Sequence, residues 1–275
     1  MTIAYLTGKK DALADARVAA LFRALSDAGY VTYPVACPED LREGTGMLLS
    51  IGGDGTFLNC ARIAVSGDIP VLGVNLGRLG FLSEYKPEDV ADAILSGEFS
   101  VEEREMLHVS VEGADCSGIW PYALNEVTVH RIGPNMLGVD ARVGDSVLPT
   151  YWADGLLVAT SSGSTAYSLS VGGPICTPDV RAHIIAPIAP HNLNMRPLVV
   201  PDSCPVRLEL HSRDGRAMLT MDNRHLSVPN GTAVGITPAE CRLKRVALHS
   251  SSFISVLRSR LFWGEDVRNS REKDL

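Results

Sequence analysis

This sequence of 275 residues lacks a surplus of basic residues, a long apolar run and an apolar N-terminal leader. Lys and Arg number 25 against 32 Asp and Glu, and the net charge of −7 argues against binding to a nucleic-acid backbone. The longest stretch free of charge or strong polarity, near residues 184–190, is far short of the roughly 20 residues that span a membrane. Charged residues also stand where a signal peptide needs its apolar stretch. We therefore expect no nucleic-acid partner and no membrane partner.

Paired cysteines and metal-ligand spacings are also missing. The six cysteines, at positions 37, 60, 116, 176, 204 and 241, are widely spaced and form no CxxC motif. The seven histidines show no metal-ligand spacing, and HExxH does not occur. The sequence therefore assigns no metal ligand directly, and it predicts mostly buried, reduced thiols in a cytoplasmic protein.

The one unusual abundance is glycine, with 25 residues against roughly 19 for average usage. The apolar content of 45% is that of an ordinary globular protein and excludes a disordered chain.

Two patterns divide the chain. Up to about residue 100, apolar strands alternate with amphipathic helices, which indicates a parallel α/β sheet. Strands are expected at 2–7, 30–36, 46–51 and 69–74, and helices at 11–28, 56–65 and 87–96, with Thr56 as an N-cap and Gly29 closing the first helix. From residue 106 to about 250, short alternating runs separated by turns indicate antiparallel β structure. We expect an α/β N-terminal domain over 1–100, a mainly antiparallel β C-terminal domain over 101–250, and a helix within 251–275 that returns to the first domain.

The first glycine cluster, Gly52-Gly53-Asp54-Gly55-Thr56, lies between a predicted strand and a predicted helix. Such a loop suits phosphate, because glycines allow close approach and a helix N-terminus offers free N–H groups. A tight turn without a ligand explains the spacing about equally well. The presence of Asp54 favours the functional interpretation over the simple turn. Its carboxylate would repel a phosphate unless it holds Mg²⁺ or accepts a proton from an attacking hydroxyl. Neither GxxxxGK[ST] nor GxGxxG occurs, which argues against a P-loop enzyme and an ordinary Rossmann dehydrogenase.

A second cluster, GVNLGRLGF at 73–81, also follows a predicted strand. Arg78 in this loop is able to reach a phosphate, although an exposed arginine in a glycine-rich loop is the commoner case. Two loops that follow neighbouring parallel strands open at the same edge of a sheet.

Two polar motifs lie in the β region. Residues 154–174, DGLLVATSSGSTAYSLSVGGP, run from a strand into hydroxyls and glycines that suit recognition of hydroxyls and base edges, with Tyr167 offering a flat face. Ser164 is not in a GxSxG motif, so a serine hydrolase is disfavoured. Asn125-Glu126 marks either an ordinary strand end or a pair that binds the two hydroxyls of a ribose.

Together these motifs resemble the NAD kinase family. GGDGTFL at 52–58, PVLGVNLGRLGFL at 70–82, the NE pair at 125–126 and the run at 154–174 stand in the family's order and spacing, and RPLVVPDS at 196–203 is also similar. The resemblance covers nearly the whole chain. It implies transfer of the terminal phosphoryl group of ATP, or of polyphosphate, to the 2′-hydroxyl of the adenosine ribose of NAD, which gives NADP. It also implies Mg²⁺ or another divalent cation as cofactor, and a homodimer or homotetramer.

The resemblance also implies roles for individual residues. Asp54 matches the catalytic base, and the donor phosphates fall to Gly52, Gly53, Gly55, Thr56 and Arg78. The NAD-binding positions are Asp54, Gly55, Asn59, Phe81, Asn125, Glu126, Asp154, Ser162, Thr165, Ala166, Tyr167, Ser168, Leu169 and Ser170.

Some positions depart from the family pattern, and two other functions stay open. Many members carry a basic residue where Asn59 or Met136 stands, a proline at Ser161, and Gly-Gln at Asn223-Arg224. A related lipid or sugar kinase shares the GGDGT loop, although the polar run at 162–170 argues against an acyl groove. A non-catalytic sensor of nicotinamide nucleotides would keep the binding residues without turnover.

Overall fold

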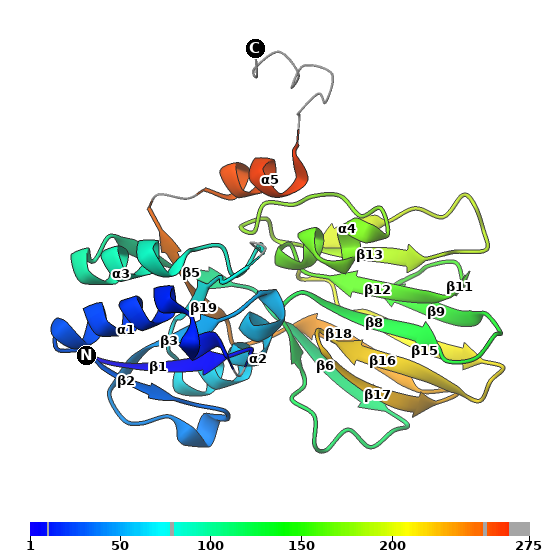
Figure 1. Ribbon diagram of the computed structural model, residues 1–275. Helices are drawn as coiled ribbons and strands as arrows, with labels where there is room; N and C mark the ends of the chain where they lie inside the picture. Colours follow the sequence, from blue (N-terminus) through cyan, green and yellow to red (C-terminus); the bar gives the residue numbers. More distant parts are fainter. Residues whose placement is uncertain (10, 78–79, 250–251, 264–275) are drawn as a thin grey trace, which may run out of the picture. The chain divides into compact units, whose positions relative to one another are not determined.

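The computed structural model describes residues 1–9, 11–77, 80–249 and 252–263 and divides the chain into two compact units (Figure 1). Unit 1 is Met1–Glu102 together with the segment that starts at Lys244, and unit 2 is the continuous stretch Glu103–Leu243. Unit 2 is therefore inserted into unit 1. The sequence pattern assigned residues up to 250 to the β region, but the segment from Lys244 belongs to unit 1, because its strand pairs in parallel with a strand there.

Unit 1 is built on sheet A, which is six-stranded in the described part of the chain. Its order is β2 (Val31–Pro34), β1 (Thr2–Thr7), β3 (Thr45–Ile51), β4 (Val71–Val74), β19 (Leu243–Leu248) and β5 (Phe99–Arg104). The pairings of β1 with β2, β1 with β3, β3 with β4 and β4 with β19 are parallel, as the α/β pattern predicts. The carboxyl ends of β3 and β4 are therefore neighbours at one edge of sheet A.

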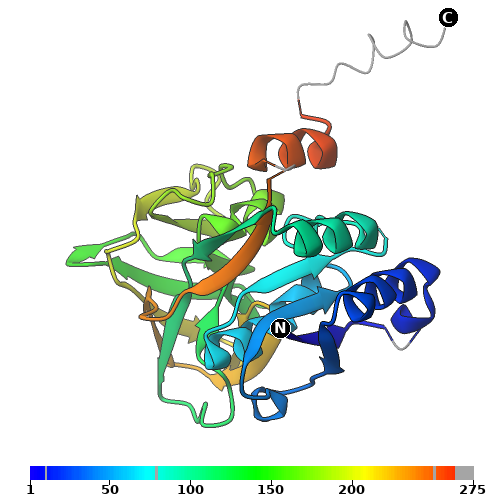
Figure 2. The ribbon, with the colours of Figure 1, turned by 90° about the vertical axis from the view of Figure 1, so that its left-hand side faces the viewer.

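Helices cover both faces of sheet A (Figures 1 and 2). The covering helices are α1 (Ala16–Asp27), α2 (Asp54–Gly67) and α3 (Pro87–Ser96), with short 3₁₀ turns at Ala12–Ala14 and Pro38–Asp40. A further helix of unit 1, α5 (Phe253–Leu261), follows β19. Met47, Leu49 and Ile51 of β3 share a buried core with α1 and α3. Because strand residues alternate between faces, Ser50 points to the other side, where its hydroxyl meets Cys60 of α2.

The first helix is shorter than the spacing predicted. It begins at Ala16 instead of residue 11, because the Asp15 carboxylate accepts the backbone N–H of Arg17 and caps the helix there. Gly29 follows the helix with φ +82°, which confirms its predicted place after the last turn.

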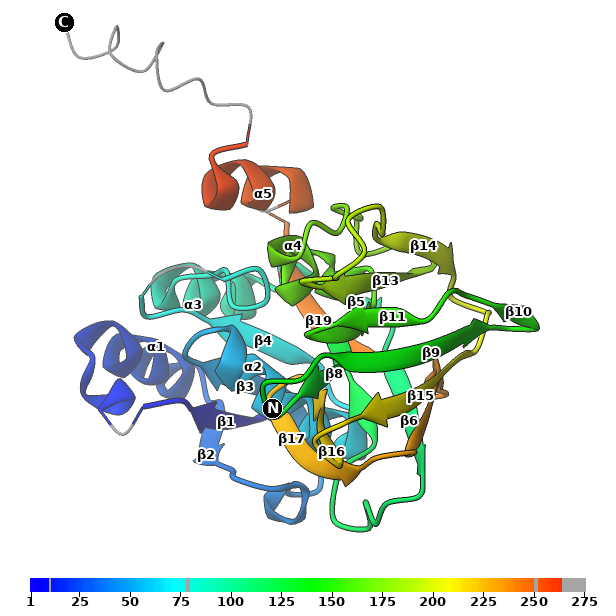
Figure 3. The ribbon, with the colours of Figure 1, turned by 90° about the vertical axis from the view of Figure 1, so that its right-hand side faces the viewer.

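Unit 2 contains two antiparallel sheets and two short helical turns. Sheet B has the order β10 (Ser146–Val147), β9 (Leu137–Val143), β15 (Val206–Ser212), β18 (Ala233–Pro238), β6 (Leu107–Glu112) and β7 (Tyr122–Ala123), and β11 (Tyr151–Ala153) also pairs with β9. Sheet C has the order β14 (Leu198–Pro201), β13 (Ala182–Ile188), β12 (Gly155–Ala159), β8 (Glu126–Arg131), β16 (Arg216–Met221) and β17 (Arg224–Pro229). The helical turns are Ser162–Thr165 and α4 (Tyr167–Ser170). Figure 3 shows β9 between β11 and β15.

The core of unit 2 lies between sheets B and C. Alternate residues of each strand enter it, such as Val127 and Val129 of β8 and Leu208 and Leu210 of β15. Strand β12 is buried on both faces, because Leu157 packs in a second cluster on the far side of sheet C. This central, fully buried strand leads directly into the Ser/Thr/Gly run.

All six cysteines are free thiols, as the spacing predicts. Only Cys60 is buried, however, and the other five are half-buried, so the expectation of mostly buried thiols was wrong. No helix among the described residues is long and apolar enough to span a membrane.

Candidate functional site

The two glycine loops of unit 1 lie side by side, as predicted. The first leads from β3 into α2, and the second follows β4, the neighbouring strand of sheet A. The backbone N–H of Gly52 donates to the carbonyl of Val74 at 2.8 Å, which joins the ends of the two strands. Arg78, the predicted phosphate ligand in the second loop, lies outside the described residues.

Helix α2 begins earlier than the sequence pattern indicated. Its N-cap is the extended Gly53, and Asp54 is the first helical residue, so the prediction of Thr56 as N-cap was wrong. The Thr56 side chain is buried beneath the loop, since a Cβ added at Gly8 or Gly52 would come within 2.1 or 2.3 Å of its Oγ1. Its N–H donates to the Gly53 carbonyl. Thr56 therefore supports the loop from within.

Gly53 and Gly55 have no structural reason to be glycine. Both are exposed, and no atom lies within 4 Å of where their Cβ would be. Gly53 has φ −94°, and Gly55 is an ordinary helical residue without a positive φ. Because neither backbone conformation nor packing requires glycine here, close approach of a ligand to the start of α2 remains the physical explanation.

The Asp54 carboxylate is held by the second loop. Its Oδ1 accepts the N–H groups of Leu82 (3.0 Å) and Ser83 (2.9 Å), and its Oδ2 accepts that of Phe81 (2.9 Å). Gly80 makes this contact possible, because a Cβ there would lie 1.8 Å from Oδ1. A carboxylate at a helix N-terminus is thus fixed in place, and its Oδ2 accepts only one of these three bonds.

The second loop is itself ordered by Asn75, which is buried at the end of β4. Its Nδ2 donates to the Ser83 carbonyl at 2.8 Å, and its Oδ1 accepts the Gly77 N–H at 2.7 Å. Its backbone N–H donates to the Tyr85 carbonyl at 2.7 Å. The asparagine of the GVNLG motif therefore shapes the loop that holds Asp54.

Arg260 of α5 is a cation that interacts electrostatically with Asp54, and the sequence did not indicate this. It is half-buried, and burial lowers the pKa of its guanidinium, while the carboxylates of Glu84 and Asp54 act in the opposite direction. Its Nε is buried without a hydrogen-bond partner. Helical spacing predicts α5 but not which elements its arginines meet, so the sequence carried no signal for this placement.

In unit 2, the predicted Asn125-Glu126 pair stands at the start of β8 and is anchored through its backbone. The buried Asp222 carboxylate accepts the N–H groups of Leu124 (2.8 Å), Asn125 (2.8 Å) and Glu126 (3.2 Å). Arg224 lies 3.6 Å from this carboxylate. The sequence singled out Arg224 only as a departure from the family and did not identify Asp222 as an anchor.

Both side chains of this pair carry polar atoms without partners. Asn125 Oδ1 and Glu126 Oε2 are buried with no hydrogen-bond partner, and so is the Oγ of Ser168 in α4. Burial, and then the charge of Asp222, raise the pKa of Glu126 to about 8, although the Tyr167 N–H partly opposes this. Buried polar atoms without partners are costly, and they mark places where a polar ligand fits.

The Ser/Thr/Gly run packs against the same pair. The Thr160 hydroxyl donates to the Leu124 carbonyl at 2.7 Å and accepts the Gly163 N–H at 3.0 Å. A Cβ at Gly163 would lie 2.0 Å from the Asn125 carbonyl oxygen. The structure therefore brings together, within unit 2, two motifs about 35 residues apart in the sequence.

Most other predicted NAD-binding residues of unit 2 also stand on this run. Tyr167 is exposed and stacks on His130, with ring centroids 5.9 Å apart. Ser170 is exposed, and the remaining members are half-buried: Ser162, Thr165, Ala166 and Leu169. Asp154, at the other end of β12, forms an ion pair with Arg131.

The remaining residues that the sequence singled out differ in how far they are buried. Ser164 is fully buried, and its hydroxyl is bonded to the backbone of Cys176, so it is no exposed nucleophile. Ser161 is likewise buried and bonded to Val180 and Ala182. Asn59 is exposed on α2 of unit 1, Phe81 is half-buried there, and Met136 is exposed in unit 2. Among the described residues, no group of three or more His, Cys, Asp and Glu side chains is arranged to hold a metal ion.

The fold and the glycine loops define a class of protein, a two-unit protein with glycine-rich loops at one edge of a parallel sheet, and comparison with known proteins defines the family. The sequence profile of the ATP-NAD kinase N-terminal domain matches residues 30–98, and that of the C-terminal domain matches residues 124–248. An NAD kinase of Flavobacterium johnsoniae is 40% identical over 81% of this chain and 78% of its own length. An NAD kinase of Porphyromonas gingivalis is 42% identical over 86% of this chain and 83% of its own. The chain belongs to the NAD kinase family and is a kinase.

Solved structures agree with this assignment. The crystal structure of an NAD kinase from Archaeoglobus fulgidus, in complex with ATP, has a TM-score of 0.76 at 27% identity and covers 95% of this chain and 99% of its own. Yeast NADH kinase has a TM-score of 0.82 at 24% identity, covers 98% of this chain and 89% of its own, and shows the shared fold. The predicted combination of an α/β unit with an antiparallel β unit is thus confirmed.

Proposed function

We propose that this chain transfers the terminal phosphoryl group of ATP to the 2′-hydroxyl of the adenosine ribose of NAD, with Asp54 as the general base. Asn125 and Glu126 bind ribose hydroxyls, and the run Thr165–Ser170 binds the rest of the dinucleotide. Gly53 and Gly55 leave the start of α2 open to the donor phosphates. Asn59, Phe81, Asp154 and Ser162 are further NAD contacts that the family resemblance assigns.

The observation that carries this proposal is the trio of buried, unpartnered polar atoms on Asn125, Glu126 and Ser168. A ribose hydroxyl both donates and accepts a hydrogen bond, so it can satisfy an amide oxygen, a carboxyl or a hydroxyl that lacks a partner. An acyl chain would leave these atoms unsatisfied, at a cost of about 1–3 kcal/mol each. This argues against the lipid kinase alternative.

The chemistry of Asp54 follows from its fixed position. A ribose hydroxyl is a weak nucleophile at neutral pH, and a carboxylate within hydrogen-bond reach accepts its proton as the new O–P bond forms and the bond to ADP breaks. Of the three N–H groups that residues 81–83 donate to Asp54, Oδ2 accepts one, that of Phe81, which leaves it capacity for the hydroxyl proton. The backbone N–H groups that donate to Asp54 hold its carboxylate in one orientation, as preorganised catalysis requires.

The divalent cation that the family implies fits an arrangement in which ATP supplies most of the ligands. Mg²⁺ usually keeps several waters and binds one or two carboxylates together with substrate phosphates. Asp54 is the carboxylate at the start of α2, and the described residues offer no larger group of metal ligands. When bound, the ion neutralises charge on the phosphates.

The direct test is incubation with NAD, ATP and Mg²⁺, followed by measurement of NADP. We expect turnover, and Asp54→Asn should lower kcat by about 10²–10⁴-fold with little change in the KM for NAD. Tight NAD binding without NADP formation would instead support the sensor. Near-normal kcat in Asp54→Asn would remove Asp54 from the role of base. Polyphosphate in place of ATP tests the second donor.

The family resemblance also implies a homodimer or homotetramer in the cytoplasm. We expect sedimentation of the purified chain at a mass of two or four chains, and a purely monomeric active enzyme would contradict this.

A further inference from the structure

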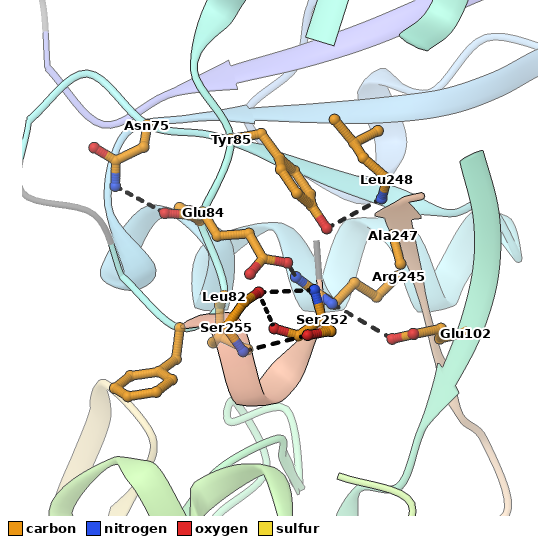
Figure 4. Close-up of polar contacts among 12 residues, drawn as sticks. Asn75, Leu82, Glu84, Tyr85, Glu102, Arg245, Ala247, Leu248, Ser252 and Ser255 are labelled. Carbon is orange, nitrogen blue, oxygen red and sulfur yellow. Dashed lines mark hydrogen bonds and ion pairs between the residues drawn. The ribbon is translucent and has the colours of Figure 1, made fainter. Parts of the chain in front are cut away.

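A buried arginine of unit 1 joins two carboxylates on different elements (Figure 4). The Arg245 side chain, on β19, is only 6% exposed. Its Nη2 forms an ion pair with Glu84, and its Nη1 lies 3.4 Å from Glu102 Oε2. Its guanidinium also lies 5.9 Å from the ring centre of Tyr85. The planar guanidinium offers separate donors to each carboxylate, which a lysine cannot do in the same geometry.

The two partners of Arg245 come from functionally different parts of unit 1. Glu102 is the last residue before the chain passes into unit 2, and Arg245 is the second residue after it returns. Glu84 belongs to the loop between β4 and α3. Arg245 therefore connects the two segments where the chain leaves and re-enters unit 1 to the loop that contains Glu84.

That loop is the one that holds Asp54. Glu84 directly follows Phe81–Ser83, whose three backbone N–H groups donate to the Asp54 carboxylate. On its other side, Tyr85 is fixed through its hydroxyl, which accepts the Leu248 N–H of β19 at 3.1 Å. A shift of Glu84 or Tyr85 would move the N–H groups that orient Asp54.

We propose that Arg245 is a positioning residue for Asp54, acting through Glu84 and the backbone of residues 81–83. This inference rests on the proposed function, since it assumes that Asp54 acts as the base. The ion pair fits this role better than one of stability alone, because well-packed apolar side chains often stabilise a core as well as a buried ion pair does.

A double-mutant cycle on kcat tests the inference. Arg245→Met combined with Glu84→Gln removes both charges of the buried ion pair together, and the half-exposed Glu102 stays solvated. This pair of changes is made in the natural chain and in the Asp54→Asn chain, and Arg245→Lys is made in both as the conservative variant. Lys244→Met is the matched control, because Lys244 is adjacent on β19 but pairs with the exposed Asp68.

In the natural chain, we expect Arg245→Met with Glu84→Gln to lower kcat about tenfold or more, as for a small misplacement of a catalytic group. In the Asp54→Asn chain, the same changes should alter kcat by less than about twofold, because the group that Arg245 positions is gone. Arg245→Lys should give a smaller loss with the same dependence on Asp54, and Lys244→Met should leave kcat unchanged.

Equal losses of kcat in both backgrounds would overturn the inference, because they indicate a general loss of active enzyme. Unchanged kcat in the natural chain would overturn it as well. If the variant with Arg245→Met and Glu84→Gln does not fold, the kcat losses of Arg245→Lys in the natural chain and in the Asp54→Asn chain are compared in the same way. A normal kcat in Asp54→Asn alone is a different outcome, since it contradicts the proposed function and not only this inference.

Discussion

The glycines around Asp54 differ in what they do, although the sequence presents them as one motif. Gly52 has φ +157° and packs on Thr56. Gly80 leaves space for the Asp54 carboxylate, which a Cβ at that position would occupy. Gly53 and Gly55 have open space beside them. Substitutions at Gly53 and Gly55 therefore test how closely a ligand approaches, whereas substitutions at Gly52 and Gly80 disturb the packing of the loops.

We expect Gly55→Ala to keep or raise thermal stability, by up to about 1 kcal/mol, because alanine favours a helix. The KM for ATP should nevertheless rise about tenfold, since a methyl group occupies the approach to the helix start. Gly80→Ala is the contrasting variant, because its Cβ would displace the Asp54 carboxylate and lower kcat. Melting curves and ATP titrations measure both. An unchanged KM in Gly55→Ala would contradict donor binding at this loop.

Glu126 makes a pH-dependent contribution to stability. Burial and the nearby Asp222 raise its pKa from 4.5 to about 8 in the folded chain. The folded state therefore holds a proton that the unfolded state has released between these pH values, and stability from this group is complete below 4.5 and lost as pH rises through about 8.

Glu126→Gln should accordingly gain stability relative to the natural chain as pH rises, reaching a few kcal/mol near pH 9, with no gain at pH 4. Urea unfolding at several pH values gives this difference directly. A difference that does not change with pH would contradict a raised pKa for Glu126.

At the scale of elements, the loop after β4 depends on a side chain from α2. The N–H groups of Phe81, Leu82 and Ser83 all donate to Asp54. We expect Asp54→Ala to speed hydrogen exchange of these three amides at least tenfold, because their acceptor is removed. The Leu48 amide of β3, which donates to the Pro70 carbonyl, is the internal reference. Unchanged protection of residues 81–83 would show that Asp54 does not order the loop.

The order of elements and the two main loops were predictable from sequence, because periodicity and glycine placement are local signals. The prediction that both glycine loops open at one edge was confirmed, since β3 and β4 are parallel neighbours. The errors also have local causes. Thr56 resembled an N-cap, but its hydroxyl packs on the backbone of Gly8 and Gly52. Residues 243–248 follow directly on the β region in the sequence, and only pairing with β4 assigns them to sheet A.

At the scale of the whole molecule, unit 2 is one continuous stretch with its own core. Its two ends are close together, since Arg242 Nε lies 3.8 Å from Glu103 Oε2. We expect residues 103–243 to fold alone as a β protein with a cooperative thermal transition, which circular dichroism measures. Because Asp54 is absent from this fragment, it should form no NADP. A fragment without a cooperative transition would show that unit 2 needs unit 1 to fold.

The sequence by itself determined the fold class, the family and the residues of the GGDGT, NE and GSTAYSLS motifs, because these depend on short-range spacing and residue type. Only the tertiary structure decided what surrounds them. Asp222 anchors Asn125-Glu126 from nearly 100 residues away, and Arg245 reaches Glu84 across 161 positions. Hydrogen bonds and ion pairs between distant segments leave no periodic trace in a sequence, so the supports of a site emerge only when the chain is folded.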